Sequence, residues 1–329
     1  MSSDLRRRIF KIGSRKEFEQ TSLEIFHLQA ENNAVYKDFI SNLGIKREDI
    51  RSLSEIPFLP IEFFRKHKII TGTSPVETVF ESSGTTGLMT SRHYVSDLSI
   101  YEESFLTGFG YFYGEPEDWF FGGLLPSYIE RGNSSLIYMV DKLVRKSSDR
   151  CSGFFINEIE KLTDALRKVK SEKRKGILIG VSFALLDLAE KQSPDLSGIT
   201  VVETGGMKGR RKEITREELH SILKRKFKLS TVHSEYGMTE LLSQAWSKGE
   251  GLFYCPPWMK ILIRDPGDPL SVIDNWGIAG GINIIDLANL NSCSFIATGD
   301  LGKLYSDGGF EVLGRFDSSD IRGCNLLVE

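Results

Sequence analysis

The middle of the chain alternates short apolar segments with segments of helical periodicity, and this order constrains the fold more than any other feature. Apolar runs at 119–125, 176–181 and 199–203 have the length of buried strands. Between and after them, in 157–169 and 215–227, apolar residues recur every three or four positions, as on one face of a helix. This βαβα order predicts an α/β fold with a largely parallel sheet covered by helices.

Local signals add further elements to this outline. Asn157 with Glu160, and Thr215 with Glu218, form capping-box patterns that predict where two helices begin. The other elements expected in the first 250 residues are helices over 15–45 and 182–191, strands over 75–80 and 229–233, and an apolar connector over 56–64 that contains two prolines.

The pattern becomes β-rich from about residue 255. Short strands are expected over 259–264, 281–286 and 294–297, and a hairpin over 303–313 turns at the sequence Asp-Gly-Gly. No linker separates this part from the rest, so we expect the two to share one core. We place the main domain at 1–312 and a short C-terminal segment at 313–329.

Composition excludes several classes of protein. A hydrophobic share of 40% over 329 residues is enough for a large core, which argues against disorder. The 42 basic and 45 acidic residues lack the excess positive charge of a nucleic-acid binder. There is no apolar run of roughly 20 residues to span a membrane, and no signal peptide is recognised. The cysteines show no metal-site or disulfide spacing, which favours reduced thiols and a cytoplasmic protein.

The first motif whose residues suggest a binding role follows the strand expected at 75–80. Its glycines permit turns in which successive N–H groups converge on an anion, and its hydroxyls add donors suited to a polyphosphate. It is not a Walker A loop, and a glycine- and serine-rich turn without a ligand has the same composition. The motif is Ser82-Ser83-Gly84-Thr85-Thr86-Gly87.

The second motif, Tyr236-Gly237-Met238-Thr239-Glu240, follows another expected strand. It therefore lies where α/β proteins bind ligands, beyond the carboxyl ends of strands. The tyrosine ring can stack on a base, the threonine can bond a phosphate, and the glutamate can hold Mg²⁺. The alternative is a plain strand-to-helix loop.

Two more motifs lie in the β-rich part. In 297–302, Asp300 stands between two glycines, where its carboxylate can accept both hydroxyls of a ribose. Arg315, in the sequence Gly-Arg-Phe-Asp, can reach a ribose or a phosphate. An ordinary aspartate turn and a solvated arginine are the alternatives.

Taken together and in this order, the four motifs resemble those of the adenylate-forming superfamily of acyl ligases. The chain looks most like the LuxE-type acyl-protein synthetases, and next most like phenylacetate-CoA ligases. Segments at 56–62, 124–135, 235–244 and 321–326 also look like the LuxE type. The resemblance covers residues 50 to 329.

The resemblance implies that ATP and Mg²⁺ convert a carboxylic acid, here a fatty acid by analogy, to an acyl-adenylate. Residues 82–87 would embrace the β- and γ-phosphates. Gly205 and Gly206 would let adenine lie against the backbone, with Tyr236 across it. The remaining roles would be Thr239 at the α-phosphate, Glu240 at Mg²⁺, and Asp300 and Arg315 at the ribose. The acyl pocket would involve Tyr128 and Arg131, and His93 is a further candidate beside the phosphate loop.

The sequence departs from the superfamily pattern in two places. The Pro-Lys that often continues the phosphate loop is replaced by Leu88-Met89, which leaves Arg92 as the candidate cation. Only residues 318–329 follow the arginine motif, so we expect the large C-terminal lid to be absent.

The short C-terminal segment carries a candidate acceptor. In LuxE-type enzymes a cysteine near the C-terminus receives the acyl group as a thioester and passes it to an acyl reductase subunit. Cys324 is in the matching place, and Arg322 beside it would favour the thiolate. Two alternatives stay open. One is an acyl-CoA ligase in which Cys324 is dispensable, and the other is a non-catalytic module that binds nucleotide.

Overall fold

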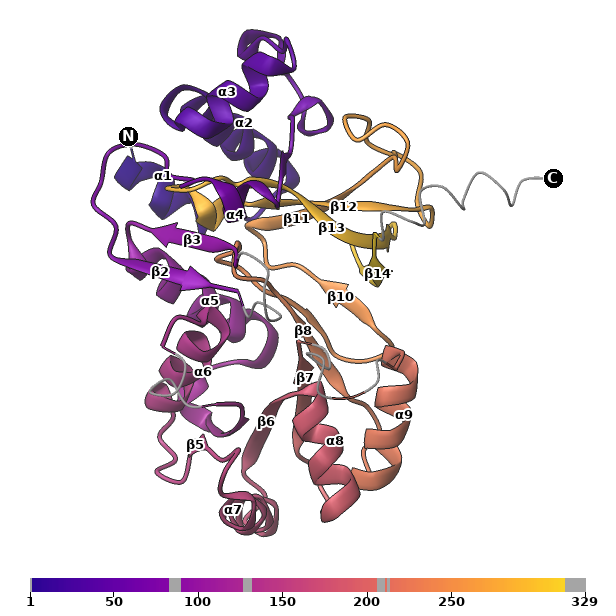
Figure 1. Ribbon diagram of the computed structural model, residues 1–329. Helices are drawn as coiled ribbons and strands as arrows, with labels where there is room; N and C mark the ends of the chain where they lie inside the picture. Colours follow the sequence, from indigo (N-terminus) through magenta and orange to yellow (C-terminus); the bar gives the residue numbers. More distant parts are fainter. Residues whose placement is uncertain (1, 83–89, 127–131, 206–210, 212–213, 317–329) are drawn as a thin grey trace, which may run out of the picture.

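The computed structural model describes residues 2–82, 90–126, 132–205, 211 and 214–316, and all structural statements below concern these residues. Within them, twelve strands form one large sheet in the order β11-β12-β13-β14-β10-β9-β8-β7-β6-β4-β5, with β1 beside β13. The strands β2 and β3 form a separate hairpin. Figure 1 shows the large sheet running through the molecule, with helices along both of its sides.

The strands have the following bounds: β1 Leu59–Pro60, β2 Thr78–Glu81, β3 Arg92–Val95, β4 Trp119–Leu124, β5 Gly153–Phe154, β6 Lys175–Val181, β7 Thr200–Thr204, β8 His233–Tyr236, β9 Ala245–Ser247, β10 Leu252–Tyr254, β11 Met259–Arg264, β12 Ala279–Asp286, β13 Phe295–Leu304 and β14 Phe310–Arg315. The α-helices are α1 Ser2–Ile9, α2 Arg15–Asn32, α3 Ala34–Asn42, α4 Phe63–Lys66, α5 Leu98–Tyr113, α6 Ser135–Lys146, α7 Ile159–Ser171, α8 Ser182–Lys191 and α9 Arg216–Phe227. Short 3-10 helices are η1 Arg47–Asp49, η2 Leu53–Glu55, η3 Pro116–Asp118 and η4 Leu287–Asn289.

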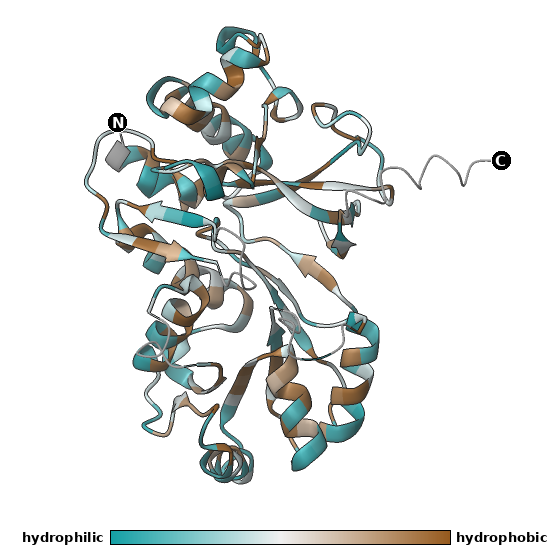
Figure 2. Cartoon of the chain, viewed as in Figure 1, coloured by the Kyte–Doolittle hydropathy of each residue, from teal (hydrophilic) through white to brown (hydrophobic). Residues whose placement is uncertain are grey.

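The parallel part of the sheet consists of β5, β4, β6, β7 and β8, as the βαβα order predicts. In Figure 1, α5 and α6 lie on one face of these strands, and α8 and α9 lie on the other. Hydrophobic residues gather on the strands and on the inner sides of the helices (Figure 2). No helix in the described ranges has both the length and the apolar character needed to cross a bilayer.

The β-rich part continues this same sheet. Strands β9 to β14 pair antiparallel with one another and with β8, and they extend the sheet beyond β8, while the short β1 lies parallel to β13. A single cluster of buried side chains runs from Leu5 to Phe310, which confirms the expected shared core. The boundary that we expect at residue 312 falls inside β14, and it stays a prediction.

Several expected elements have different bounds. The helix expected over 15–45 is two helices, because Asn33 ends α2 and its side chain caps α3. The strand expected over 229–233 begins only at His233, since the preceding residues form the turn after α9. The segment containing Asp300 is part of β13 rather than a turn. The apolar connector contains β1 and leads into α4.

The two capping predictions have opposite outcomes. Thr215 and Glu218 form the expected capping box of α9. Asn157 does not cap α7, whose N-cap position is Glu158 without a side-chain capping bond. The helix α7 instead begins at Ile159, one residue later than an N-cap at Asn157 indicates.

Candidate active site

The first motif lies between the two strands of the β2–β3 hairpin. At the base of this loop, the Ser82 N–H donates to Ser91 O at 3.1 Å, and the Ser91 N–H donates to Ser82 Oγ at 2.9 Å. Arg92, the candidate cation, has its Nε 3.2 Å from Glu81 Oε1 across the hairpin. The remaining members of the motif, Ser83, Gly84, Thr85, Thr86 and Gly87, lie outside the described residues.

The hairpin is docked on the second motif through two side chains. His93 is fully buried, and its Nδ1 lies 2.9 Å from the backbone oxygen of Thr239. A carbonyl oxygen only accepts, so Nδ1 carries the proton. Burial lowers the pKa of His93 to about 4, which keeps the ring neutral at pH 7. The Ser91 side chain acts on the Glu240 carboxyl and lowers its pKa, against the effect of burial.

The second motif begins at the carboxyl end of β8, next to the end of the parallel strand β7. Gly237 makes the chain pass close to its neighbours, since a Cβ there would lie 2.3 Å from Glu235 Oε1. The Thr204 hydroxyl at the end of β7 donates to Glu235 Oε2 at 2.5 Å. Gly205 follows with a φ of +64°, a conformation that favours glycine. These contacts bring the two strand ends together, as the predicted ligand site requires.

Glu240 is a buried carboxylate, with 5% of the residue exposed. Burial raises the pKa of its carboxyl, while the Ser91 hydroxyl and the charges of Arg65 and Arg315 act in the opposite direction. Magnesium ions are commonly held by one or two protein carboxylates together with substrate phosphates. A cation at this desolvated carboxylate would offset the cost of its charge, so Glu240 fits that role. No group of three or more His, Cys, Asp or Glu side chains suited to a metal occurs among the described residues.

The third and fourth motifs meet the second at Asp300. The Tyr236 hydroxyl donates to Asp300 Oδ2 at 2.8 Å, and Arg315 Nε lies 3.5 Å from Asp300 Oδ1. The aspartate is paired with the arginine because β13 and β14 are adjacent in this register. Burial, and then the charge of Asp300, raise the pKa of Tyr236 well above its usual value, so the phenol stays a donor.

Tyr236 has a different environment from the one its expected stacking role implies. Its ring packs against Phe253 and Phe310, with centroid separations of 5.8 and 5.6 Å. The ring is therefore part of the core in this structure, and its hydroxyl orients the Asp300 carboxylate. Stacking of the ring on adenine stays a prediction.

The hairpin and the described members of the second, third and fourth motifs are thus joined by contacts. The hairpin contacts the second motif through His93, the second contacts the third through Tyr236, and the third contacts the fourth through Arg315. Ordered carboxylates, hydroxyls and an arginine in one place can bind the ribose and phosphates of a nucleotide. The other expected site residues, Gly206, Tyr128, Arg131 and Cys324, lie outside the described residues.

Some residues of this region carry no sequence signal. Arg65 belongs to α4, just after the apolar connector, yet its charge acts to lower the pKa of Glu240. Asn289 in η4 donates from Nδ2 to the Glu240 backbone oxygen at 2.8 Å. The Thr298 hydroxyl accepts from the Asp300 N–H at 3.1 Å, and only its proximity in the motif could have suggested it.

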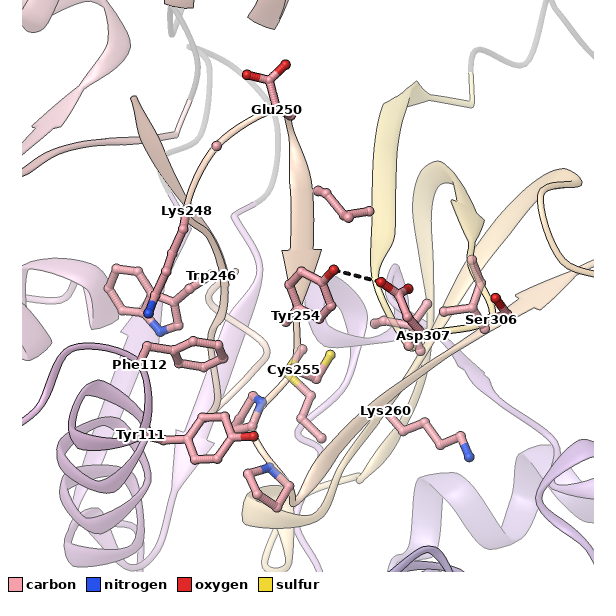
Figure 3. Close-up of a pocket in the computed structure, with 18 of the residues that line it drawn as sticks. Tyr111, Phe112, Trp246, Lys248, Glu250, Tyr254, Cys255, Lys260, Ser306 and Asp307 are labelled. Carbon is pink, nitrogen blue, oxygen red and sulfur yellow. Dashed lines mark hydrogen bonds between the residues drawn. The ribbon is translucent and has the colours of Figure 1, made fainter. Parts of the chain in front are cut away.

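A cavity of about 850 Å³ lies elsewhere, between the end of α5 and the turns of the β9–β10 and β13–β14 hairpins. Figure 3 shows Trp246, Tyr254 and Lys248 around it, with the Tyr254 hydroxyl hydrogen-bonded to Asp307. Its lining includes none of the motif residues discussed above. The strand registers place its hairpin turns at the ends opposite Asp300 and Tyr236, so we separate this cavity from the candidate site.

Comparison with solved structures identifies the fold. The chain is similar to ATP-bound MatB from Rhodopseudomonas palustris, with 20% identity, a TM-score of 0.55, and coverage of 74% of this chain and 49% of that one. It is similar to 2-hydroxyisobutyryl-CoA ligase in complex with 2-HIB-AMP and CoA, with 13% identity, a TM-score of 0.63, and coverage of 93% and 77%. For O-succinylbenzoate coenzyme A synthetase from Bacillus subtilis, in complex with ATP and magnesium ion, identity is 19%, the TM-score is 0.51, and coverage is 74% and 50%.

The chain therefore has the fold of the adenylate-forming enzymes. It spans about half the length of the first solved structures that it matches. No family model matches the sequence, and a search of curated proteins finds no match.

Proposed function

We propose that this protein activates a carboxylic acid with ATP and then transfers the acyl group to a thiol. The observation that supports this most is that three contacts join the motifs: His93 of the hairpin meets the Thr239 oxygen, the Tyr236 hydroxyl donates to Asp300, and Arg315 lies beside the same carboxylate. Segments far apart in the sequence contribute these contacts, on a fold shared with a coenzyme A ligase and a coenzyme A synthetase.

In the first step, a carboxylate oxygen attacks the α-phosphorus of ATP. An acyl–O–P bond forms, the bond to the β-phosphate oxygen breaks, and pyrophosphate leaves with the electron pair. Asp300 would accept hydrogen bonds from the ribose, with one of its oxygens already oriented by Tyr236. A magnesium ion held by Glu240 would neutralise charge on the phosphates. The residues contribute chiefly by positioning.

In the second step, a thiolate attacks the acyl carbon and AMP leaves. We place the acceptor at Cys324, following the LuxE-type resemblance, with a fatty acid as the substrate and an acyl reductase as the next recipient. The second candidate is transfer to coenzyme A. One observation favours it, because two of the similar structures are coenzyme A ligases or synthetases that carry an adenylate or ATP.

Exchange of labelled pyrophosphate into ATP, measured over a library of carboxylic acids, tests the first step. Exchange that depends on one class of acid supports the proposal. Absence of exchange with every acid, while ATP still binds, would contradict it and favour a module that only binds nucleotide.

Intact-mass measurement with the active acid tests the second step. A mass increase that hydroxylamine removes is expected in the parent protein and in Cys151→Ser, the matched control at an exposed cysteine. It should be absent in Cys324→Ser. If Cys324→Ser instead releases acyl-CoA at the parent rate when coenzyme A is added, the acceptor is coenzyme A.

A further inference from the structure

The segment that carries Thr239 and Glu240 has no regular secondary structure of its own. It follows β8 and continues to residue 244, and one turn bond, from Leu241 N–H to Met238 O at 3.1 Å, lies within it. A segment with so little internal bonding depends on its surroundings for a fixed conformation. We call residues 239–243 the site segment.

Three side chains from other elements bond the backbone of the site segment. His93 of β3 donates to the Thr239 oxygen at 2.9 Å, and Asn289 of η4 donates to the Glu240 oxygen at 2.8 Å. Asp286, at the end of β12, accepts from the N–H groups of Leu242 and Ser243 at 2.8 and 3.0 Å. Four of the five residues in the segment are thus held by side chains distant in sequence.

The Asp286 carboxylate is also fixed from other directions. Its Oδ1 accepts from the Ser243 hydroxyl at 2.6 Å and from the Ala288 N–H at 3.1 Å. The Ser243 hydroxyl oxygen, Oγ, in turn accepts from Trp258 Nε1 at 3.0 Å and contacts Ser104 Oγ at 3.1 Å. This network joins the site segment to α5 and to the residues before β11.

Two of the three side chains each leave a polar atom without a partner. His93, Asp286 and Asn289 are all fully buried. Within the described part of the chain, His93 Nε2 and Asn289 Oδ1 have no hydrogen-bond partner. A buried polar atom without a partner costs stability, so an apolar side chain at position 93 would serve a purely structural role better.

We infer that His93, Asp286 and Asn289 are positioning residues, which hold the site segment so that Thr239 and Glu240 face the nucleotide before it binds. The inference rests on the proposed function and assigns these three residues a part in it. Their contacts are to backbone atoms, so they act on the reaction through the two motif side chains. Fixing a segment in advance removes an ordering cost from the reaction step, and small misplacements slow such steps strongly.

A pair of substitutions at position 93 separates positioning from simple structural support. His93→Leu removes the donor to Thr239 and also removes the unpartnered Nε2. His93→Asn keeps an amide nitrogen near the position of Nδ1. We expect His93→Leu to lower the maximal pyrophosphate-exchange rate by about tenfold or more, with little change in the KM for the acid and little loss of thermal stability.

The control, His93→Asn, should recover most of the exchange rate even if it is less stable than His93→Leu, because it leaves space in the core. The inference would be overturned if the pyrophosphate-exchange rates of the two variants followed their thermal stabilities and not the presence of a donor at position 93. It would also be overturned if both variants exchanged pyrophosphate at the parent rate.

Hydrogen exchange provides a readout that needs no activity. Asp286→Asn replaces an acceptor of the Leu242 and Ser243 amides with a group that also donates. We expect faster deuterium uptake in a peptide covering 239–244 and no change in α9, which serves as the internal control. Unchanged deuterium uptake in 239–244 would refute the positioning role. A parent protein without any pyrophosphate-exchange activity would instead refute the proposed function, and the deuterium-uptake result would still hold.

Discussion

At the scale of single residues, the Tyr236 hydroxyl is the most informative atom of the candidate site. It donates to Asp300 Oδ2 at 2.8 Å in a buried position, so removing it leaves one carboxylate oxygen without its donor. We expect Tyr236→Phe to weaken ATP binding several-fold, since loss of one such bond typically costs about 1 kcal/mol. Calorimetric titration with Mg·ATP measures the effect.

Tyr254→Phe is the matched control for this substitution. Tyr254 donates to Asp307 Oδ2, also at 2.8 Å, but at an exposed position on the cavity away from the site. We expect ATP affinity to be unchanged in this variant. Equal losses in the two variants would mean that Tyr236 has no specific role in nucleotide binding.

Asp286 leads to a prediction about pH. Burial raises the pKa of this carboxyl from 3.8 to about 6, although its hydrogen bonds act in the opposite direction. As pH falls, the folded protein therefore takes up this proton before the unfolded chain does. The contribution of the protonated Asp286 carboxyl to the free energy of unfolding is complete below about pH 4. It is lost as pH rises through 6, a change of about 3 kcal/mol.

Urea unfolding of the parent and of Asp286→Asn between pH 4 and 7 tests this prediction. The free energy of unfolding of the parent, relative to the variant, should fall as pH rises across this range. Parallel curves would show that Asp286 is not the titrating group. Burial, and then the charge of Asp286, raise the pKa of the Cys255 thiol, so this thiol stays neutral over the same range.

Residue types alone were enough to propose part of the candidate site. Asp300 between two glycines and Glu240 after a strand end could be named as candidates, because their chemistry and their place in the strand order point the same way, and their roles stay predictions. Asp286 and Asn289 were not, since a buried polar side chain that bonds a distant backbone leaves no periodic signal. Arg65 is similar, because only folding brings α4 near Glu240.

At the scale of secondary structure, elements with strong periodicity were predicted well. The helix over 182–191 and the strand over 259–264 have the expected bounds. Prediction failed where neighbouring strands decide the conformation. Residues 297–302 resemble a turn locally, but pairing with β12 and β14 makes them the middle of a ten-residue strand.

The two glycines around Asp300 therefore have different structural requirements. A Cβ at Gly302 would lie 2.5 Å from the Glu311 backbone oxygen and 2.6 Å from Ile282 Cδ1, whereas nothing lies within 4 Å of one at Gly299. We expect Gly302→Ala to destabilise the fold by about 2 kcal/mol through overpacking, and Gly299→Ala to change stability little. Thermal unfolding of the two variants measures this, and equal stabilities would contradict the described β13–β14 contact.

At the scale of the whole molecule, the candidate site depends on the continuity of the sheet. The second motif follows β8 in the parallel part, while Asp300 and Arg315 lie on β13 and β14 in the antiparallel part. The strand order separates β8 from β14 by β9 and β10. The sequence indicated both parts, but their pairing into one sheet depends on long-range contacts, which a pattern along the chain does not encode.

A ligand that contacts both parts should stabilise the entire fold, because it binds the folded chain and not the unfolded one. At a concentration of Mg·ATP one hundred times its Kd, the expected gain is about 2.7 kcal/mol. Thermal unfolding with and without Mg·ATP should show a single transition that moves to higher temperature. We expect Asp300→Ala to lose most of this shift, and Asp307→Ala, in the β13–β14 turn, to keep it. If only part of the protein were stabilised, giving two transitions, the nucleotide would contact one part of the sheet alone, and the site described here would be wrong.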